Sequence, residues 1–390
     1  MLKNIVILLV CIISLMCAAC GTTSTELVIS NANGIEVEYQ DGKLIFVDSL
    51  SDMNIYPSGY GGCTLTPTSD VSFDEDTVIS CYSKIICDDK HSDVINLCRD
   101  PICDHKKENT CIHSYGLIRN GIIVEDYIYF RDTLGIYRYS MNTLTTEPYA
   151  VFNKQVMSQF RMGKYLYICV DYGVFIKVDL TNDQAVVLSI EQLEYGMIYP
   201  YEGALYCLDG VSGIWRCDQN FDNAELIVPA RSFDCHIPYS YQIYENKLYY
   251  VSIEDKTQYL YAYDLSDNNV EWRIPDVYCF NIYDGILYTQ LYDPQDGPEF
   301  LNSKGNIVTT VEQTGGKIYM SLLSDPDSFR ILCELDESEK RLDGYFVYAT
   351  DRYIYAEVAE FSNLKINTCL YRYDMECNLW QKIGNGVYTE

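Results

Sequence analysis

The chain has 390 residues, and its 56 Asp and Glu residues outnumber its 28 Lys and Arg residues, which gives a formal net charge of −28 at pH 7. Nucleic-acid binding depends on clustered basic side chains that meet the phosphates, so this composition excludes nucleic acid as the expected partner. The charge also disfavours electrostatic attachment to anionic lipid, and it is typical of a soluble, self-repelling surface.

The N-terminal residues are typical of an export signal. Lys3 supplies a positive charge, and an apolar run from Ile5 to Met16 follows it. A run of about a dozen residues is short for a membrane span, which needs about twenty. The next residues place small side chains before a cysteine, in the order Cys17-Ala18-Ala19-Cys20-Gly21. This pattern resembles the lipobox of bacterial lipoproteins, although Cys17 stands where that family commonly has an aliphatic residue.

The lipobox resemblance implies a domain order and a location. Residues 1–19 are expected to form a lipoprotein signal peptide, and Cys20 is expected to carry a diacylglycerol as the new N-terminus. Residues 20–41 then form the lipidated tether. The protein is expected to be exported and lipid-anchored to the outer face of the cell membrane. The alternatives are an ordinary secretory signal cleaved after Ala19 and an uncleaved anchor.

A predicted strand at residues 42–46 is followed by a segment rich in cysteine and histidine at about residues 63–114. Near its end lie five residues of the types that bind zinc, namely Cys98, Cys103, His105, Cys111 and His113. A structural zinc site is therefore one interpretation, and zinc is the one cofactor that the sequence suggests. The spacing matches no standard zinc finger, and export favours disulfides, for which the segment offers the further cysteines Cys63, Cys81 and Cys87. Unliganded thiols are the third interpretation.

From residue 127 onward a short aromatic strand recurs at a spacing of roughly 40 residues, which falls within the range of known structural repeats. Its repeated tyrosines are Tyr129, Tyr167, Tyr206, Tyr249, Tyr288, Tyr319 and Tyr355. A second strand motif follows most of these at a variable distance and commonly ends in Asp, as at Asp264. Constant strands with a variable distance between them indicate hairpins with variable tips. We interpret the Asp residues as turn residues, because their carboxylates can accept hydrogen bonds from nearby backbone N–H groups.

Strands rich in Tyr, Ile and Val, separated by frequent turns, predict an all-β fold. A period of roughly 40 residues accommodates four strands, which make one blade of a β-propeller. We therefore predict a single β-propeller over residues 42–390. Seven units follow one another from Tyr127 onward, and the strand at residues 42–46 begins an eighth, so eight four-stranded blades are predicted. The alternative is seven blades, in which the N-terminal strands complete the last blade and close the ring.

The repeats resemble the β-propeller domains of lipoproteins from Gram-positive anaerobes and, more distantly, the YWTD propellers of low-density-lipoprotein receptors. The resemblance covers roughly residues 42–383, and the segment at residues 98–111 resembles an element of the same lipoproteins. Its motifs are degenerate, since the chain has neither a YWTD sequence nor a Trp-Asp blade signature. The resemblance implies the fold and the location, and it implies no activity.

Two pairs of cysteines lie on opposite arms of predicted hairpins. Cys207 with Cys217 and Cys369 with Cys377 are each candidates for a disulfide across the hairpin. Simple apolar packing of Cys207 and Cys217 is the other interpretation, because Phe130 and Tyr139 occupy the same positions in another repeat.

The sequence assigns no catalytic residue. It contains no nucleophile elbow, phosphate-binding glycine loop, dinucleotide fingerprint or His-Glu-x-x-His motif. Cys235 and His236 are neighbours whose side chains would point to opposite faces of a strand, so they do not form a ready dyad. We expect a surface module that binds a glycan, a peptide or a protein partner. The alternative is an exported carbohydrate- or cell-wall-active enzyme that uses paired carboxylates from different blades.

Overall fold

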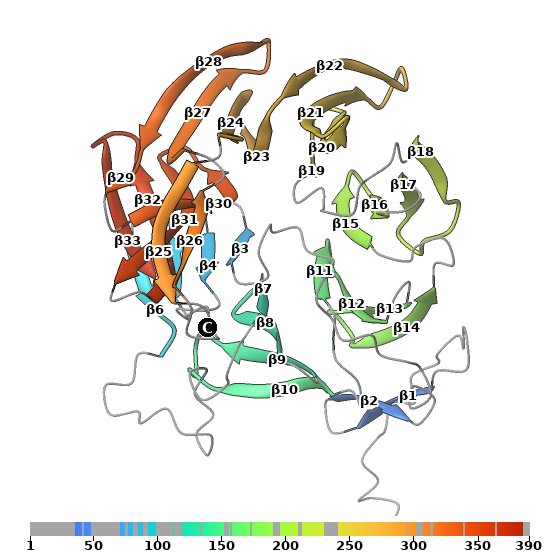
Figure 1. Ribbon diagram of the computed structural model, residues 1–390. Coiled ribbons are helices and arrows are strands. Elements are labelled where there is room, and N and C mark those ends of the chain that lie inside the picture. Colours follow the sequence, from blue (N-terminus) through green and yellow to red (C-terminus); the bar gives the residue numbers. More distant parts are fainter. Residues whose placement is uncertain are drawn as a thin grey trace, which may run out of the picture.

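The structure is a computed structural model of the chain (Figure 1). The described residues are 36–40, 43–47, 71–74, 77–80, 85–88, 93–98, 112, 119–132, 135–151, 156, 158–171, 174–189, 196–209, 213–229, 241–293, 295–301, 307–312, 315–337, 340–362 and 365–384. They form β-strands joined by turns, which confirms the predicted all-β fold. No helix within these residues is long and apolar enough to cross a membrane.

Six four-stranded antiparallel blades follow one another from residue 119 to residue 384 and are arranged around a centre, as in a β-propeller (Figure 1). Blade 1 contains β7 (Arg119–Val124), β8 (Tyr127–Asp132), β9 (Gly135–Ser140) and β10 (Thr146–Val151). Blade 2 contains β11 (Ser158–Met162), β12 (Tyr165–Asp171), β13 (Val174–Asp179) and β14 (Gln184–Ser189). Blade 3 contains β15 (Gly196–Tyr201), β16 (Ala204–Asp209), β17 (Gly213–Asp218) and β18 (Glu225–Pro229).

The remaining blades are less uniform. Blade 4 contains β19 (Tyr241–Tyr244), β20 (Lys247–Glu254), β21 (Thr257–Asp264) and β22 (Asn269–Pro275). Blade 5 contains β23 (Val277–Tyr283), β24 (Ile286–Leu291), β27 (Lys317–Leu322) and β28 (Asp325–Glu334), with the hairpin of β25 (Gln295–Leu301) and β26 (Ile307–Glu312) inserted. Blade 6 contains β30 (Lys340–Ala349), β31 (Tyr353–Ser362), β32 (Lys365–Asp374) and β33 (Leu379–Gly384), and the short β29 (Asp336–Glu337) extends it.

The strands before residue 119 are arranged differently. β3 (Val71–Asp74), β4 (Thr77–Ser80), β5 (Ile85–Asp88) and β6 (Asp93–Asn96) form a separate four-stranded sheet between blade 6 and blade 1 (Figure 1). β1 (Glu36–Gln40) and β2 (Lys43–Val47) form a hairpin that adds to the outer edge of blade 1. There β2 runs parallel to β10 and pairs with it through Leu44 with Ala150 and Ile45 with Val151.

The predicted blade count of eight, or alternatively seven, is wrong. The aromatic repeat assigns Tyr288 and Tyr319 to two units, but they lie on β24 and β27, which pair directly with each other within blade 5. The repeats from Tyr127 onward therefore give six blades rather than seven. The strand predicted at residues 42–46 is β2, and it starts no blade of its own. In the described residues no N-terminal strand completes blade 6, whose outer strand is β33.

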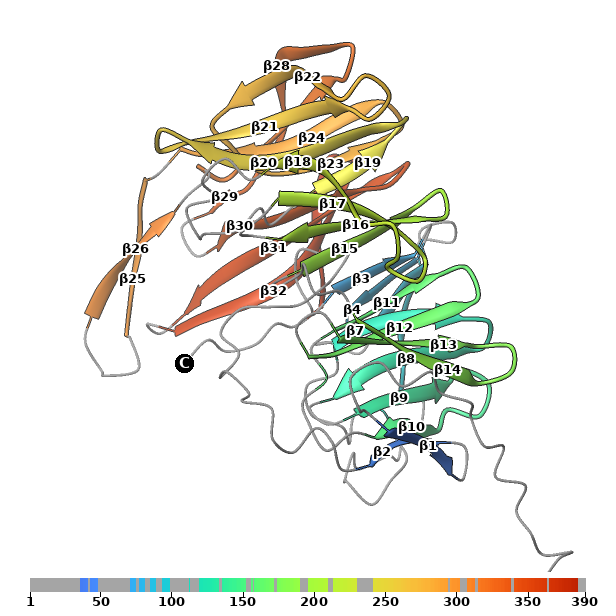
Figure 2. The ribbon, with the colours of Figure 1, turned by 90° about the vertical axis from the view of Figure 1, so that its right-hand side faces the viewer.

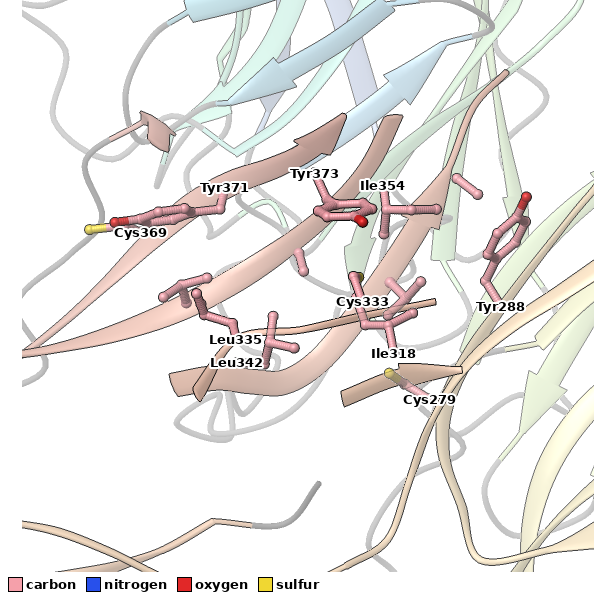
Figure 3. Close-up of a cluster of buried hydrophobic side chains, with 14 residues drawn as sticks. Cys279, Tyr288, Ile318, Cys333, Leu335, Leu342, Ile354, Cys369, Tyr371 and Tyr373 are labelled. Carbon is pink, nitrogen blue, oxygen red and sulfur yellow. The ribbon is translucent and has the colours of Figure 1, made fainter. Parts of the chain in front are cut away.

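The core lies between neighbouring blades, because the strands alternate their side chains between the two faces of each sheet. Figure 3 shows the cluster in which Cys279 and Ile318 of blade 5 face Ile354 and Tyr373 of blade 6. All four side chains are buried. Burial of one such side chain contributes about 1.5–3 kcal/mol, so these contacts hold the radial arrangement together.

Side-chain amides on the inner strands join one blade to the next. Gln242 on β19 donates from Nε2 to the carbonyl oxygen of Ile282 at 2.7 Å and accepts from the amide N–H of Ile282 at 2.8 Å. Asn281 on β23 accepts from the amide N–H of Ala349 on β30 at 2.9 Å. Among the described strands, adjacent blades do not pair through a backbone ladder. The side-chain amides instead bond to the backbone N–H and C=O groups of the next blade's inner strand, which gives these groups a partner.

The Asp residues at the ends of the third strands are turn residues, as predicted. Asp264 accepts hydrogen bonds from the amide N–H groups of Ser266 and Asp267 at 2.7 and 3.1 Å. Asp374 accepts in the same way from Glu376 and Cys377. Each carboxylate therefore closes the turn that leads to the outer strand.

Candidate binding face

The two ends of the propeller differ in the length of their connections. Short turns join first to second strands on one end, at residues 125–126, 163–164, 202–203, 245–246 and 284–285, and we name this end the turn face. The opposite end carries the connections between blades at residues 152–157, 190–195 and 230–240 and, within blade 5, the longest connection, residues 292–316, and we name it the long-connection face. Connections of variable length on a rigid scaffold are where proteins place binding residues, so the long-connection face is the candidate site.

On the turn face, two tyrosine hydroxyls form hydrogen bonds with the next blade. Tyr201, at the end of the first strand of blade 3, accepts from the amide N–H of Asn246 in blade 4 at 3.3 Å. Tyr283, in the same position of blade 5, donates to Asp351 of blade 6 at 3.0 Å. The exposed Glu202 and Asp284 occupy the adjacent turns with positive φ values of 47° each. These residues fix the turns and leave their carboxylates in solvent.

A polar cluster on blade 4 lies at the long-connection end of its strands. Glu254 is the last residue of β20, and it accepts a hydrogen bond from the Tyr261 hydroxyl at 2.9 Å. Arg273 on β22 donates to the same carboxylate oxygen, and its guanidinium lies 4.6 Å from the centroid of the Tyr259 ring. Burial and the bond to Glu254 raise the pKa of Tyr261, so the phenol stays protonated and acts as a donor.

Blade 6 repeats this arrangement on its extended strands. Glu360 on β31 accepts from the Tyr371 hydroxyl on β32 and from Lys382 on β33, the latter at 2.7 Å. The thiol of Cys369 donates to the same carboxylate at 3.4 Å. Burial raises the pKa of Glu360, but the bonds from Lys382, Tyr371 and Cys369 outweigh it, so the pKa ends below its ordinary value.

The two clusters share one design, in which a glutamate on the second strand binds a tyrosine on the third and a basic residue on the fourth. At neutral pH the Glu360 carboxylate is ionised and the Tyr261 phenol is protonated. These are the protonation states that a free glutamate and a free tyrosine also have at this pH. A general acid or base needs a pKa near the working pH, and neither shift moves a group in that direction. The clusters therefore brace the long-connection ends of blades 4 and 6 rather than supply acid–base chemistry.

The hairpin of β25 and β26 is the largest described addition to the long-connection face. It leaves blade 5 after Leu291 and returns at Lys317. β25 packs against β32, and the hairpin stands away from the body of the propeller beside the extended strands of blade 6 (Figure 2). Ile307, the first residue of β26, has 59% of its surface exposed. The hairpin thus exposes at least the first residue of β26 to solvent.

Most of the predicted site residues of the N-terminal region lie outside the described residues. Cys20 and four of the five proposed zinc ligands are in this group, namely Cys103, His105, Cys111 and His113. Cys98 lies two residues after the end of β6, is partly exposed, and donates from its backbone N–H to the side-chain oxygen of Asn96 at 3.0 Å. No group of three or more His, Cys, Asp or Glu residues among the described positions is arranged to hold a metal ion. Lipidation at Cys20 and zinc or disulfides at residues 98–113 stay predictions.

Cys207 and Cys217 are brought together on neighbouring strands. Leu205 pairs with Cys217, and Cys207 pairs with Trp215, so the two cysteines are diagonal neighbours across β16 and β17. Both are buried thiols in the core between blades 2 and 3. A hydrogen bond from Cys207 lowers the pKa of the Cys217 thiol despite its burial. In this structure the pair packs as thiols.

Cys369 and Cys377 are not brought together. Cys369 is buried on β32, five residues before Asp374, the last residue of the strand, while Cys377 is exposed in the following turn. At about 3.3 Å per residue, this separation is on the order of 16 Å along the strand. Disulfides need Cα atoms within about 7 Å of each other, so this pairing does not fit the strand register.

Sequence reasoning missed the two glutamate clusters and the inserted hairpin. Glu254, Tyr261 and Arg273 come from three strands, and their contact depends on strand register that the sequence does not display. The matching positions of Tyr261 and Tyr371, each three residues before a turn Asp, were a usable signal. The interval between Tyr288 and Tyr319 was the signal for the hairpin, because it is the shortest of the series and leaves too little chain for a full blade of this protein.

No family model matches the chain, and no curated protein has a significantly similar sequence. Among solved structures, the computationally designed Ika8 protein covers 82% of this chain and 88% of its own, with 8% identity and a TM-score of 0.47. YCF48 bound to D1 peptide covers 68% of this chain and 80% of its own, with 13% identity and a TM-score of 0.47. BamB from Moraxella catarrhalis covers 74% of this chain and 94% of its own, with 10% identity and a TM-score of 0.41.

Proposed function

We propose that the protein is a binding module held at the outer face of a cell membrane, whose long-connection face engages a glycan, a peptide or a protein partner. The observation that supports it most is the difference between the two faces. One end carries short turns at which Tyr201 and Tyr283 bond to the next blade, and the other carries the inserted hairpin and the two braced glutamate clusters. A rigid scaffold with its variable segments on one side suits recognition.

The location in this proposal comes from the N-terminal sequence. The apolar run and the cysteine at position 20 support export and lipidation. The measurement is mass spectrometry of the mature N-terminus together with membrane fractionation. Wild type is expected in the membrane fraction with a diacylated Cys20, and Cys20→Ser is expected to lose the lipid. A mature chain that begins at another residue, or an unlipidated Cys20, would contradict the anchor.

The binding role is tested with thermal unfolding of the full-length protein in detergent. A ligand that binds only the native state raises the melting temperature, by about 2.7 kcal/mol of stability at a hundredfold excess over Kd. The panel contains cell-wall glycans, dietary glycans and peptides, each repeated with EDTA and with reductant. A reproducible rise with one class supports the proposal and names the ligand. A ligand that is converted to product during the scan would overturn it in favour of an enzyme.

A further inference from the structure

We propose that the outer edge of β26 is a docking edge for an extended, basic segment of a partner protein, which adds to the β25–β26 hairpin as a third strand. The inference rests on the proposed binding role and names the site and the kind of partner. Strand addition of this type gains its affinity from backbone hydrogen bonds along an open edge.

Blade 5 is complete without the hairpin. Its second strand, β24, pairs directly with its third strand, β27, through four residue pairs from Ile286 with Leu322 to Thr289 with Tyr319. The blade therefore has the same four-stranded ladder as its neighbours, and the hairpin adds nothing to that ladder. Ordering the hairpin costs conformational entropy, and the hairpin does not complete the ladder of blade 5. We therefore look for its role in binding.

The two strands of the hairpin have different edges. β25 contains Pro298, and its register with β26 is interrupted between Asp296 and Glu299. Proline and irregular register are the devices with which proteins block an open edge. β26 has the sequence Ile-Val-Thr-Thr-Val-Glu, which is rich in β-branched residues and has no proline. β26 therefore retains the features of a strand that accepts a partner.

Among the described strands, none pairs with the outer edge of β26. β25 is the strand that packs against β32, and among the described strands β26 forms a ladder with β25 alone. Figure 2 shows the hairpin reaching beyond the body of the propeller, and Ile307, the first residue of β26, has 59% of its surface exposed. In a sheet of two strands, the second edge of β26 has its backbone groups unsatisfied by any described strand.

The local charge selects the partner. Residues 293–312 contain the four acidic residues Asp293, Asp296, Glu299 and Glu312 and one basic residue, Lys304. The whole chain has a formal net charge of −28 at pH 7. A second copy of it is therefore repelled, while a basic segment is attracted. Charge complementarity of this kind raises association rates and excludes like-charged partners.

The test measures peptide binding by fluorescence anisotropy with the full-length protein in detergent. The probe is a short peptide that alternates Lys with Val and Thr. One control has N-methyl groups on alternate backbone amides and keeps the charge, and a second has Glu in place of Lys. We expect the basic probe to bind about tenfold or more tightly than either control, because the N-methylated probe loses backbone hydrogen bonds and the Glu probe loses charge complementarity. We also expect its binding to weaken as salt is added.

Matched protein variants place the binding on β26. Replacement of residues 294–314 by a short Gly-Ser linker should abolish binding. Thr309→Pro and Thr310→Pro form a second pair, because neighbouring residues of a strand point their N–H groups to opposite edges. The one that faces outward should abolish binding while the hairpin stays folded, so the test does not depend on the deletion variant. Asp296→Asn with Glu299→Gln should weaken the basic probe severalfold.

Several outcomes would overturn the docking edge. They are no binding of the basic probe, equal binding of the N-methylated probe, binding that survives the linker replacement, and preferential binding of the acidic probe. Dimerisation that is lost in the proline variant would make a second copy the occupant and would also overturn it. A glycan or protein that still raises the melting temperature after such a result would leave the proposed binding role standing.

Discussion

Asp179 ends β13, and its carboxylate accepts from Lys164 at 2.6 Å and from the backbone and hydroxyl of Thr181 at 3.0 and 2.6 Å. The bond from Lys164 is the main reason why the pKa of Asp179 falls to about 2, below its ordinary 3.8. A carboxyl with a depressed folded pKa stabilises the native state above its unfolded pKa, and this stability is lost as the pH falls through the folded pKa. Wild type should therefore be more stable to unfolding than Asp179→Asn at pH 7, and this difference in stability should disappear between about pH 4 and pH 2.

The measurement is the melting temperature of both proteins as a function of pH. Lys164→Met is the matched control, because it removes the cation and leaves the carboxylate. The double variant should be about as stable as either single variant, since both substitutions remove the same ion pair. If the difference in melting temperature between wild type and Asp179→Asn stayed constant from pH 7 to pH 2, the charge of Asp179 would not be the cause of the stabilisation.

Gln242 carries a second prediction at this scale. Its side chain forms two hydrogen bonds with the backbone of Ile282 and so joins blade 4 to blade 5. Gln242→Ala should lower the free energy of unfolding by about 1–3 kcal/mol, because two bonds are lost and two backbone groups lose their partner. Urea unfolding checks the value, and Gln219→Ala, at an exposed side chain, should change it by less than about 0.5 kcal/mol. Equal effects of the two substitutions would contradict the inter-blade role.

Single residues were predictable from the sequence where their chemistry is local. The turn role of Asp264 and Asp374 follows from the strand motif that precedes each of them. The bracing role of Glu254 does not, because its partners Tyr261 and Arg273 lie on two other strands. Cys369 and Cys377 show the same limit, since placing both on one hairpin did not determine how far each lies from the turn.

The hairpin of β25 and β26 gives the prediction at the scale of an element. Its removal should leave the free energy of unfolding within about 1 kcal/mol of wild type, because β24 and β27 keep their ladder and loop length affects closure entropy only slowly. Leu287→Ala on β24 is the contrast, since this buried side chain should cost about 2–5 kcal/mol. Urea unfolding compares the two variants. A large loss on hairpin removal would show that the hairpin supports blade 5.

The type of each element could be read from the sequence, while their grouping into blades could not. Alternating aromatic strands predicted β-structure and a propeller correctly. The motifs of Tyr288 and Tyr319 resemble the starts of two blades, whereas β24 and β27 are neighbours in one. Which strands pair is decided by the three-dimensional ladder, and an inserted hairpin changes the spacing without changing the ladder.

Hydrogen exchange gives the prediction at the scale of the molecule. The inner strands β19 and β23 are joined to the next blade by Gln242 and Asn281, so their amides should exchange only on global unfolding. The backbone amides of β26, which among the described strands pairs only with β25, should exchange at least about tenfold faster by local opening. Mass-spectrometric hydrogen exchange measures both. Uniform protection across the chain would contradict a rigid propeller with a separate arm.

The parallel contact between β2 and β10 has a mechanical consequence. Only two residue pairs join these strands, while β1 and β2 share five pairs of their own. A force applied at the N-terminus reaches blade 1 through the contact of β2 with β10. With only two residue pairs, this contact should break at a lower force than the ladders within the blades. Under load the β1–β2 hairpin should detach first, and the blades should remain folded. A single small extension before the main rupture in force spectroscopy would be its signature, so a propeller of this design would yield at the contact of β2 with β10 before its blades unfold.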